Sequence, residues 1–443
     1  MRKFLCFFVF ISSCSCLGKS YTVGQLVAAA RQRNFMVRSE VEKIYRAHNS
    51  VHITVAALLP SLNFGTIFHL VLFDILDLVP PLLGFLCPSN WFRWQESKLY
   101  LQAERLNYAT LVANEINGVE SLAYRISSVQ YLAGLYQQYI TMFKEIGAIG
   151  EARRNLGEDP ADVSLFFSNT IKKMENDYVT VANQVKKISA DLANAIALPA
   201  EVDWRTFALR PLELPNLAVI KALRYEDIIQ QVLDASLESQ AFTVLGHAAH
   251  YSTYRRVFDF VGMYSGSSNT LGFGYSSQIK IGRSYQRELS IKKESLISNL
   301  ILATQRAVLD HNTVLELYKG AVAGLANAEA WHQVLIQKFR AGGELVPQSY
   351  MNALEAMMNF HSRVVNAQHL YLITRAQLDR LLWQGDYYRD ILSLVPSGRE
   401  PSPSSVQGGE PLIKGWIHKL KRKYENHRIT AALKNKLPKN LLL

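Results

Sequence analysis

Apolar side chains recur at helical spacing over two unusually long stretches of the chain. One stretch covers residues 91–147 and the other covers 283–340, and no proline interrupts either of them. A helix rises about 1.5 Å per residue, so each stretch predicts a helix of roughly 85 Å. Such a length exceeds the width of a compact domain and favours coiled-coil packing.

Turn residues follow each long helical pattern, and a second helical pattern then begins. The turns are Gly157-Glu158-Asp159-Pro160 in the first half and Gly342 to Pro347 in the second. Glycine can end a helix, and proline suits the first turn of the next one. Helical patterns resume over about 160–197 and about 347–385. Each long helix is therefore expected to form a hairpin with an antiparallel return helix.

The segment before each long helix has a different pattern, which predicts strands. Residues about 257–282 alternate between apolar and small or polar side chains, most clearly from Leu271 to Gly282. Residues about 61–90 are the counterpart in the first half. Each segment has room for two strands of about 9–11 residues, the length that crosses a bilayer when tilted. A membrane-spanning helix over 66–87 is the competing interpretation, but two aspartates and two prolines inside that run make it costly.

The two halves of the chain repeat one plan. The helix-tip sequences at Leu156–Pro160 and Gly342–Val346 lie 186 residues apart. This distance is too long for a solenoid repeat and indicates a duplicated domain. The predicted fold class is mainly α with a small transmembrane β part, built twice from a strand hairpin and a very long helical hairpin. The repeats would cover 19–198 and 223–390, joined by a linker over 199–222.

The two ends of the chain differ from the body. Residues 1–18 have the basic start and short apolar core of a secretory signal. Cys14 lies in an Ile-Ser-Ser-Cys context that fits the loose pattern for bacterial lipoproteins, so lipidation of Cys14 and ordinary cleavage near Gly18 both stay open. Residues 391–443 form a Pro/Ser/Gly linker and a basic tail, with nine Lys or Arg and one acidic residue from Leu412 to Leu443.

Composition narrows the function classes. The net charge is +11, but most of the excess lies in the tail, which makes nucleic acid a poor inference. The tail is either a surface that contacts anionic lipid or a partner, or a solvated extension. No catalytic, cofactor or metal site is predicted, and the protein is not expected to be an enzyme. His247 and His250 have helical spacing, but no third ligand is nearby, so a surface or packed pair is expected.

The order of helix, strand pair, very long helix, tip and return helix resembles the TolC-like outer-membrane efflux protein family. Ala56 to Leu62 looks like the family's passage into its first strand, and Lys338 to Glu344 looks like its helix tip. Leu271 to Gly282 looks like its strand-to-helix passage, and Gln377 to Leu382 looks like the end of its last helix. The resemblance covers about residues 21–390.

This resemblance implies a homotrimer in the outer membrane of a Gram-negative bacterium. Each chain would give four strands to a shared twelve-stranded barrel and four helical segments to a periplasmic tunnel. The trimer would be the passive exit duct of a tripartite efflux pump or type I secretion system, with a periplasmic adaptor and an inner-membrane transporter as partners. A physical argument also favours assembly, because the four strands of one chain alone would leave unpaired strand edges in lipid. The alternative is a periplasmic coiled-coil structural or adaptor protein, with or without a lipid anchor, that forms no pore.

The helix tips are expected to close the duct and to meet the adaptor. Some family members carry an acidic ring on the second hairpin, where this chain has Ser349 and Asn352. At the start of the first long helix, Trp91 to Trp94 stand where the family has a glycine. These aromatic residues either form an interfacial belt or pack against the neighbouring helix. The predicted tip residues are Arg153, Arg154, Gly157, Glu158, Asp159, Asp162, Arg340, Gly342, Gly343, Glu344, Leu345, Ser349 and Asn352.

Overall fold

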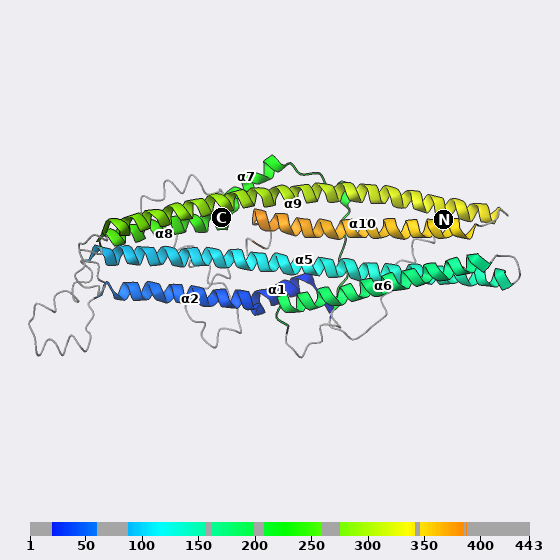
Figure 1. Cartoon of the computed structure of the whole chain (residues 1–443), viewed down its shortest axis with the longest axis horizontal. Coiled ribbons are helices and arrows are strands. Elements are labelled where there is room, and N and C mark those ends of the chain that lie inside the picture. The colour runs from blue at the N-terminus through cyan, green and yellow to red at the C-terminus, as the bar shows by residue number, and fades with distance from the viewer. Residues whose placement is uncertain are drawn as a thin grey trace, which may run out of the picture.

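The computed structural model describes an elongated, mainly helical molecule built around two very long helices. The described residues are 20–59, 87–155, 161–198, 208–258, 275–341, 346–384 and 387. Helix α5 (Pro88–Asn155) has 68 residues and helix α9 (Tyr275–Arg340) has 66. Both run nearly the whole length of the molecule (Figure 1). The long helices predicted from the proline-free apolar patterns are therefore present.

The first half surrounds α5 with three shorter helices. These are α1 (Val23–Arg33), α2 (Phe35–Ala56) and the return helix α6 (Ala161–Ala195). Thr22 begins α1 with a capping box. Its hydroxyl accepts from the backbone N–H of Gln25, and the side-chain oxygen of Gln25 accepts from the backbone N–H of Thr22. Asn34 begins α2, because its side-chain oxygen accepts from the two backbone N–H groups of Met36 and Val37.

The second half repeats this arrangement around α9. Its other helices are α7 (Tyr225–Ala235), α8 (Leu237–Phe258) and the return helix α10 (Pro347–Leu382). Pro347 occupies the first turn of α10, where its missing N–H costs nothing. Trp383 ends the helix in the left-handed conformation, with φ of 52°, and its backbone N–H donates to Arg380 and Asp379 carbonyls.

The helices form one curved layer in which the two halves lie side by side. In the first half, α2 and α6 lie along opposite ends of α5, while α8 and α10 lie along opposite ends of α9 (Figure 1). Helix α5 also packs against α8 and α10, and thereby joins the halves. The order across the layer is α2 and α6, then α5, then α8 and α10, then α9. Helix α9 forms one edge of this layer, and α2 and α6 form the other.

The core follows the middle of α5. Its buried face includes many small residues, which allow neighbouring helices to approach closely. The residues of this face that are at most 2% exposed are Ala109, Val112, Ala113, Ile116, Val119, Ala123 and Ile126.

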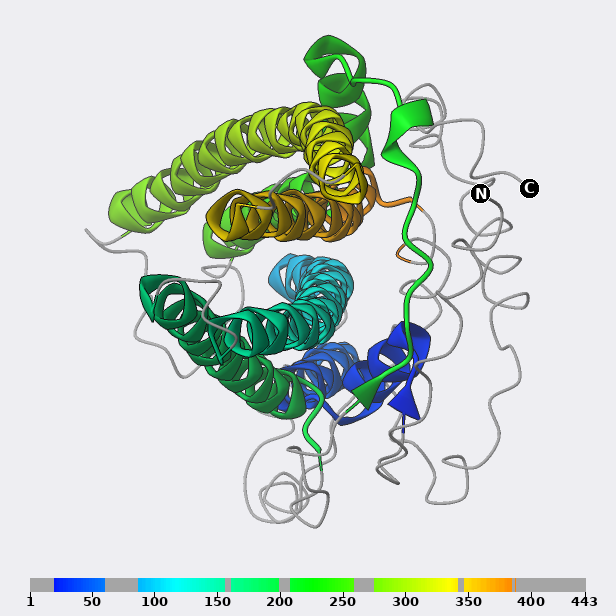
Figure 2. The ribbon, with the colours of Figure 1, turned by 90° about the vertical axis from the view of Figure 1, so that its right-hand side faces the viewer.

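The linker between the halves is anchored to both of them. Strand β2 (Ala208–Leu209) pairs in parallel with β1 (Ser20–Tyr21), and the short 3-10 helix η5 (Leu217–Val219) follows. Leu217 is fully buried against α9 and α10. Figure 2 shows the linker running along one side of the helical layer, from α1 to α7. The proline-rich composition therefore marks an ordered strap over residues 208–222.

The strand predictions need one correction, because parts of them are helical. Residues 60–86 and 259–274, where most of the predicted strands fall, lie outside the described residues. However, α5 already begins at Pro88, α8 continues to Phe258 and α9 begins at Tyr275. The prediction of strand as far as Gly282 is thus wrong from Tyr275 onward.

Contacts with α8 explain why this segment is a helix despite its alternating pattern. Gln278, Gly282 and Gln286 are four residues apart and face α8. Arg256 donates to Gln278 at 2.9 Å, and Gln286 donates to Thr253 at 3.0 Å. A Cβ on Gly282 would lie 2.6 Å from the Thr253 hydroxyl oxygen, so only glycine permits this close approach. Small or polar residues at every fourth position suit a helix face that packs closely against another helix. In the sequence they also contribute to the alternation of apolar and polar side chains that is typical of a strand.

Candidate functional site

Both helix tips lie at the same end of the molecule (Figure 1). Helix α5 ends at Asn155 and α6 begins at Ala161, while α9 ends at Arg340 and α10 begins at Pro347. Arg153 and Arg154 belong to the last turn of α5, and Asp162 belongs to the first turn of α6. The predicted turn residues lie outside the described residues; they are Gly157, Glu158, Asp159, Gly342, Gly343, Glu344 and Leu345.

Ser349 and Asn352 lie in the first two turns of α10, close to the tip. Ser349 is half-buried and Asn352 is exposed. Met351, beside Asn352, is buried in a cluster that joins three helices below the tips. The buried members of this cluster are Leu135, Tyr139, Ile140 and Phe143 of α5, Phe167 and Met174 of α6, and Met351, Leu354 and Met358 of α10. The two hairpins are thus tied together by an apolar contact that the sequence did not indicate.

Exposed ion pairs add weak links around this cluster. Lys173 of α6 lies 3.3 Å from Glu355 of α10, and so bridges the two hairpins. Within the first hairpin, Lys144 and Lys172 both contact Glu175, at 2.8 and 2.9 Å. Hydrogen bonds from these two ammonium groups lower the pKa of Glu175 to about 2. Exposed pairs of this kind contribute little to stability, so they can break without a large barrier.

A polar seam connects α5 of the first half with α8 and α10 of the second half. Arg380 of α10 donates to Asn114 of α5 at 2.8 Å and pairs with Glu238 of α8. Further along the seam, Ser128 donates to Asn366 at 2.9 Å. The seam lies in the middle of the molecule and fixes the relative register of the two halves.

His369 belongs to the same seam and is held in its neutral form. Its Nδ1 lies 2.9 Å from the Val365 carbonyl oxygen, and its Nε2 lies 3.1 Å from the Ser127 hydroxyl of α5. The carbonyl can only accept, so Nδ1 carries the hydrogen and Nε2 accepts from Ser127. Burial lowers the pKa of His369, because the charged ring would lose its hydration.

The protein is expected to lose stability as the pH falls below about 6.5. The unfolded chain binds a proton on His369 there, whereas the folded protein, whose pKa is lower, does not. Burial lowers the pKa of His311, His332 and His361 in the same direction. The melting temperature should therefore be lower at pH 5.5 than at pH 7.5. His369→Gln should reduce this difference, while replacement of the exposed His247 by Gln should not. An equal pH dependence in all three proteins would contradict the assignment.

The end opposite the tips is where the predicted strand segments begin and end. Helices α2 and α8 end there, and α5 and α9 begin there (Figure 1). Phe92 of α5 lies 5.5 Å from Tyr254 and 5.4 Å from Phe258 of α8, measured between ring centroids. Trp91, by contrast, is 45% exposed. Within the Trp91–Trp94 segment, one ring therefore packs between helices and another is exposed, while the interfacial belt stays a prediction.

The histidines considered as metal ligands lie on α8. His247 and His250 are both exposed, and the His250 ring lies 4.5 Å from that of Tyr254 in an edge-on contact. Among the described residues, no three His, Cys, Asp or Glu side chains are grouped as a metal site would need. Nor does any described helix have a long enough apolar run to cross a membrane.

Both edges of the helical layer expose large apolar side chains. On α9 they include Ile291, Leu302 and Leu309, which are 65%, 48% and 64% exposed. On the opposite edge they include Phe35 of α2 and Leu165 of α6, which are 66% and 62% exposed. Exposed apolar side chains that gather on one face typically mark an interaction site.

Three cations on the first turns of α9 were not identified from the sequence. Lys280, Arg283 and Arg287 line a hollow together with Gln286 and Ser290. Their i, i+3, i+7 spacing places them on one face of a helix, and this spacing could have indicated them. The signal was lost because the segment was interpreted as a strand.

Comparison with known proteins relates the chain to solved outer-membrane channels. No protein-family model matches the sequence. No curated protein matches it either. Among solved structures, a membrane protein from Pseudomonas aeruginosa matches with a TM-score of 0.65 and 11% identity, over 81% of this chain and 90% of that one.

Two further solved structures carry more specific descriptions. The outer membrane protein VceC from Vibrio cholerae has a TM-score of 0.62 and 11% identity, over 82% of this chain and 96% of that one. The open state of the MtrE outer membrane channel from Neisseria gonorrhoeae has a TM-score of 0.61 and 14% identity, over 81% and 88%. At such low identity the likeness is one of fold. The chain therefore has the TolC-like fold of these outer-membrane channels, as the sequence resemblance predicted.

Proposed function

We propose that this protein is the subunit of an outer-membrane channel. The proposal depends on the polarity of the molecule. The helices that flank both predicted strand segments meet at one end of the helical layer, and both helix tips lie at the other end. A channel that crosses the outer membrane and reaches into the periplasm needs this polarity. The solved structures of the same fold are described as outer-membrane channels.

The apolar edges of the layer support assembly into a homotrimer. A single curved layer leaves α9 uncovered on one side and α2 with α6 on the other. When one edge of each copy meets the other edge of the next, the contact is heterologous, and it closes into a ring if the rotation between copies divides a full turn. Three copies, as the family resemblance implies, would bury both edges and surround a tunnel. The predicted strands of three chains would then close the barrel that one chain leaves open.

The cellular role follows from this architecture. The trimer would sit in the outer membrane of a Gram-negative bacterium with most of its mass in the periplasm. It would serve as the passive exit duct for an inner-membrane transporter and a periplasmic adaptor, in a tripartite efflux pump or a type I secretion system. Lipidation at Cys14, which lies outside the described residues, would add a second anchor to the same membrane.

The tips are proposed as the gate and as the contact with the adaptor. Each trimer would bring six tips together, and Arg154 and Arg340 would pair across them with Glu158, Asp159 or Glu344. Exposed pairs contribute about 0–1 kcal/mol each, so a gate held by several of them can open when a partner docks.

Reversing the two arginines should open the duct. Arg154→Glu combined with Arg340→Glu is expected to raise single-channel conductance in planar bilayers, because like charges would replace the pairs. Lys187→Glu with Lys319→Glu is the control, since it reverses two exposed charges away from the tips. Both proteins should assemble as the wild type does. A tip variant with unchanged conductance and unchanged export would show that the tips are not the gate.

A further inference from the structure

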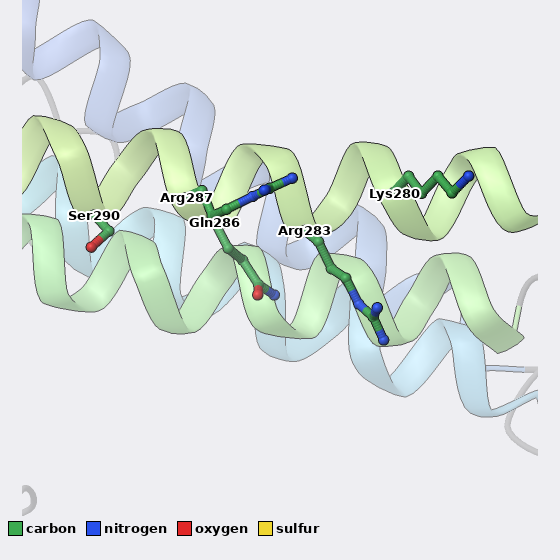
Figure 3. Close-up of a pocket in the computed structure, with 5 residues that line it drawn as sticks. All are labelled: Lys280, Arg283, Gln286, Arg287 and Ser290. Carbon is green, nitrogen blue, oxygen red and sulfur yellow. The ribbon is translucent and has the colours of Figure 1, made fainter.

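Helix α9 carries a cationic hollow near its start, between its second and fifth turns. It is lined by Lys280, Arg283, Gln286, Arg287 and Ser290, has a volume of ≈ 650 Å³ and is open to solvent. Figure 3 shows Arg283 and Arg287 extending towards the N-terminal end of α9, the direction in which helical side chains tend to point. Their charged groups are thereby directed towards the end of the molecule from which the predicted strand segments leave.

No carboxylate in the described ranges neutralises these three cations. The closest acid along α9 is Glu288, which pairs with Lys292 at 2.6 Å. The facing helix α8 carries one acid, Glu238, near its far end, where it pairs with Arg380. Gln286 is held by α8, since its amide donates to Thr253 at 3.0 Å. Gln286 therefore fixes one side of the hollow against α8, and no carboxylate of the described residues forms an ion pair with its three cations.

The last turns of α2 in a second copy would not supply the missing charge. In the proposed ring, the edge of α2 would approach α9. The part of α2 nearest the strand end runs from His48 to Ala56 and contains no carboxylate. An anion from outside the described residues would complete the charge of the hollow.

Exposed aromatic side chains lie at the same end of the molecule as the hollow. Trp91, Tyr254 and Tyr285 come from the same end of three helices and are 45%, 42% and 39% exposed. Exposed tryptophan and tyrosine concentrate where a membrane protein meets the lipid headgroups. If the predicted strands cross the bilayer, the hollow lies at the level of the headgroups on the periplasmic side.

We propose that this hollow binds the phosphodiester headgroup of an anionic phospholipid in the periplasm-facing leaflet. The guanidinium groups of Arg283 and Arg287 match phosphate oxygens with paired N–H donors, and Lys280 adds a third charge. Basic pockets beside a membrane typically select acidic lipids in this way. The assignment rests on the proposed function, because it needs this end of the protein at a bilayer.

Lipid bound to the purified full-length protein, counted by native mass spectrometry, tests the assignment. The protein is equilibrated in micelles that contain equal amounts of phosphatidylglycerol and phosphatidylethanolamine. The wild type should retain phosphatidylglycerol with a preference of about tenfold or more. The triple variant Lys280→Gln, Arg283→Gln, Arg287→Gln should lose this preference. The triple variant Lys186→Gln, Lys187→Gln, Lys319→Gln is the control, and it should keep the preference despite the same change in charge.

Three results would overturn the assignment. The wild type could show no lipid preference, or the triple variant of Lys280, Arg283 and Arg287 could keep the preference. Displacement of the lipid by a modest excess of inorganic phosphate would indicate a site for the free ion. Conductance of the same preparations separates this inference from the proposed function. A conducting wild type without lipid preference would reject only the lipid site, whereas a wild type that retains the lipid but does not conduct would reject only the channel.

Discussion

Replacement of Arg380 by alanine is expected to lower the free energy of unfolding by about 3–5 kcal/mol. Arg380 is 7% exposed and connects three helices, because it donates to Asn114 of α5 and pairs with Glu238 of α8 from its own position on α10. Its guanidinium also lies 5.2 Å from the ring centroid of Trp383. The alanine variant leaves the mostly buried carboxylate of Glu238, 13% exposed, without its cation, and this largely desolvated charge is the main cost. Chemical unfolding of the purified protein measures it.

Arg375→Ala is the matched control for Arg380→Ala. Arg375 lies on the same helix and pairs with Asp379 at 3.0 Å, but its side chain is 54% exposed. Water screens such a pair, so its loss should cost about 0–1 kcal/mol. Equal losses in the two variants would show that the seam between the halves contributes no more than a surface ion pair.

Loss of the trimer is the expected result of Leu302→Glu combined with Leu309→Glu. The two leucines lie two helical turns apart on the free edge of α9 and are 48% and 64% exposed. In the single chain the new carboxylates would remain in water, so the fold should persist. In the proposed ring they would be buried against α2 or α6 of the next copy without a partner, at a high cost. The mass of the detergent-solubilised complex should fall from that of three chains to that of one.

Two comparisons make this result specific. Leu302→Met with Leu309→Met keeps the edge apolar and should leave the trimer intact. Helical content, measured by circular dichroism, should be the same in both double variants and in the wild type. A glutamate variant that still forms trimers would place the subunit contact elsewhere on the molecule.

The sequence predicted the helical framework because that framework depends on local rules. Long proline-free patterns of helical period are sufficient to identify α5 and α9, and glycine with proline is sufficient to identify both tips. The sequence did not predict the start of α9, because Gln278, Gly282 and Gln286 interrupt the apolar pattern of the helix. These residues are small or polar because they contact α8. Only the facing helix shows that their spacing of four residues is the meaningful period.

The contacts between the halves could not be predicted. Arg380 is separated from Glu238 by 142 residues and from Asn114 by 266. Each of these residues alone is an ordinary polar residue on a helix, and its burial depends on the register in which the helices pack. The same holds for the apolar edges, because an exposed leucine and a core leucine look alike in the sequence.

A cryo-electron microscopy structure of the full-length protein in lipid nanodiscs would show whether the chain forms a trimeric channel. We expect a closed ring of three copies around a lumen, with α9 of each copy against α2 and α6 of the next. Residues 60–86 and 259–274 should cross the bilayer as strands, and the tips should meet at the far end of the helices. A single copy, or a helical assembly that leaves the bilayer uncrossed, would contradict the channel and would favour a periplasmic coiled-coil adaptor.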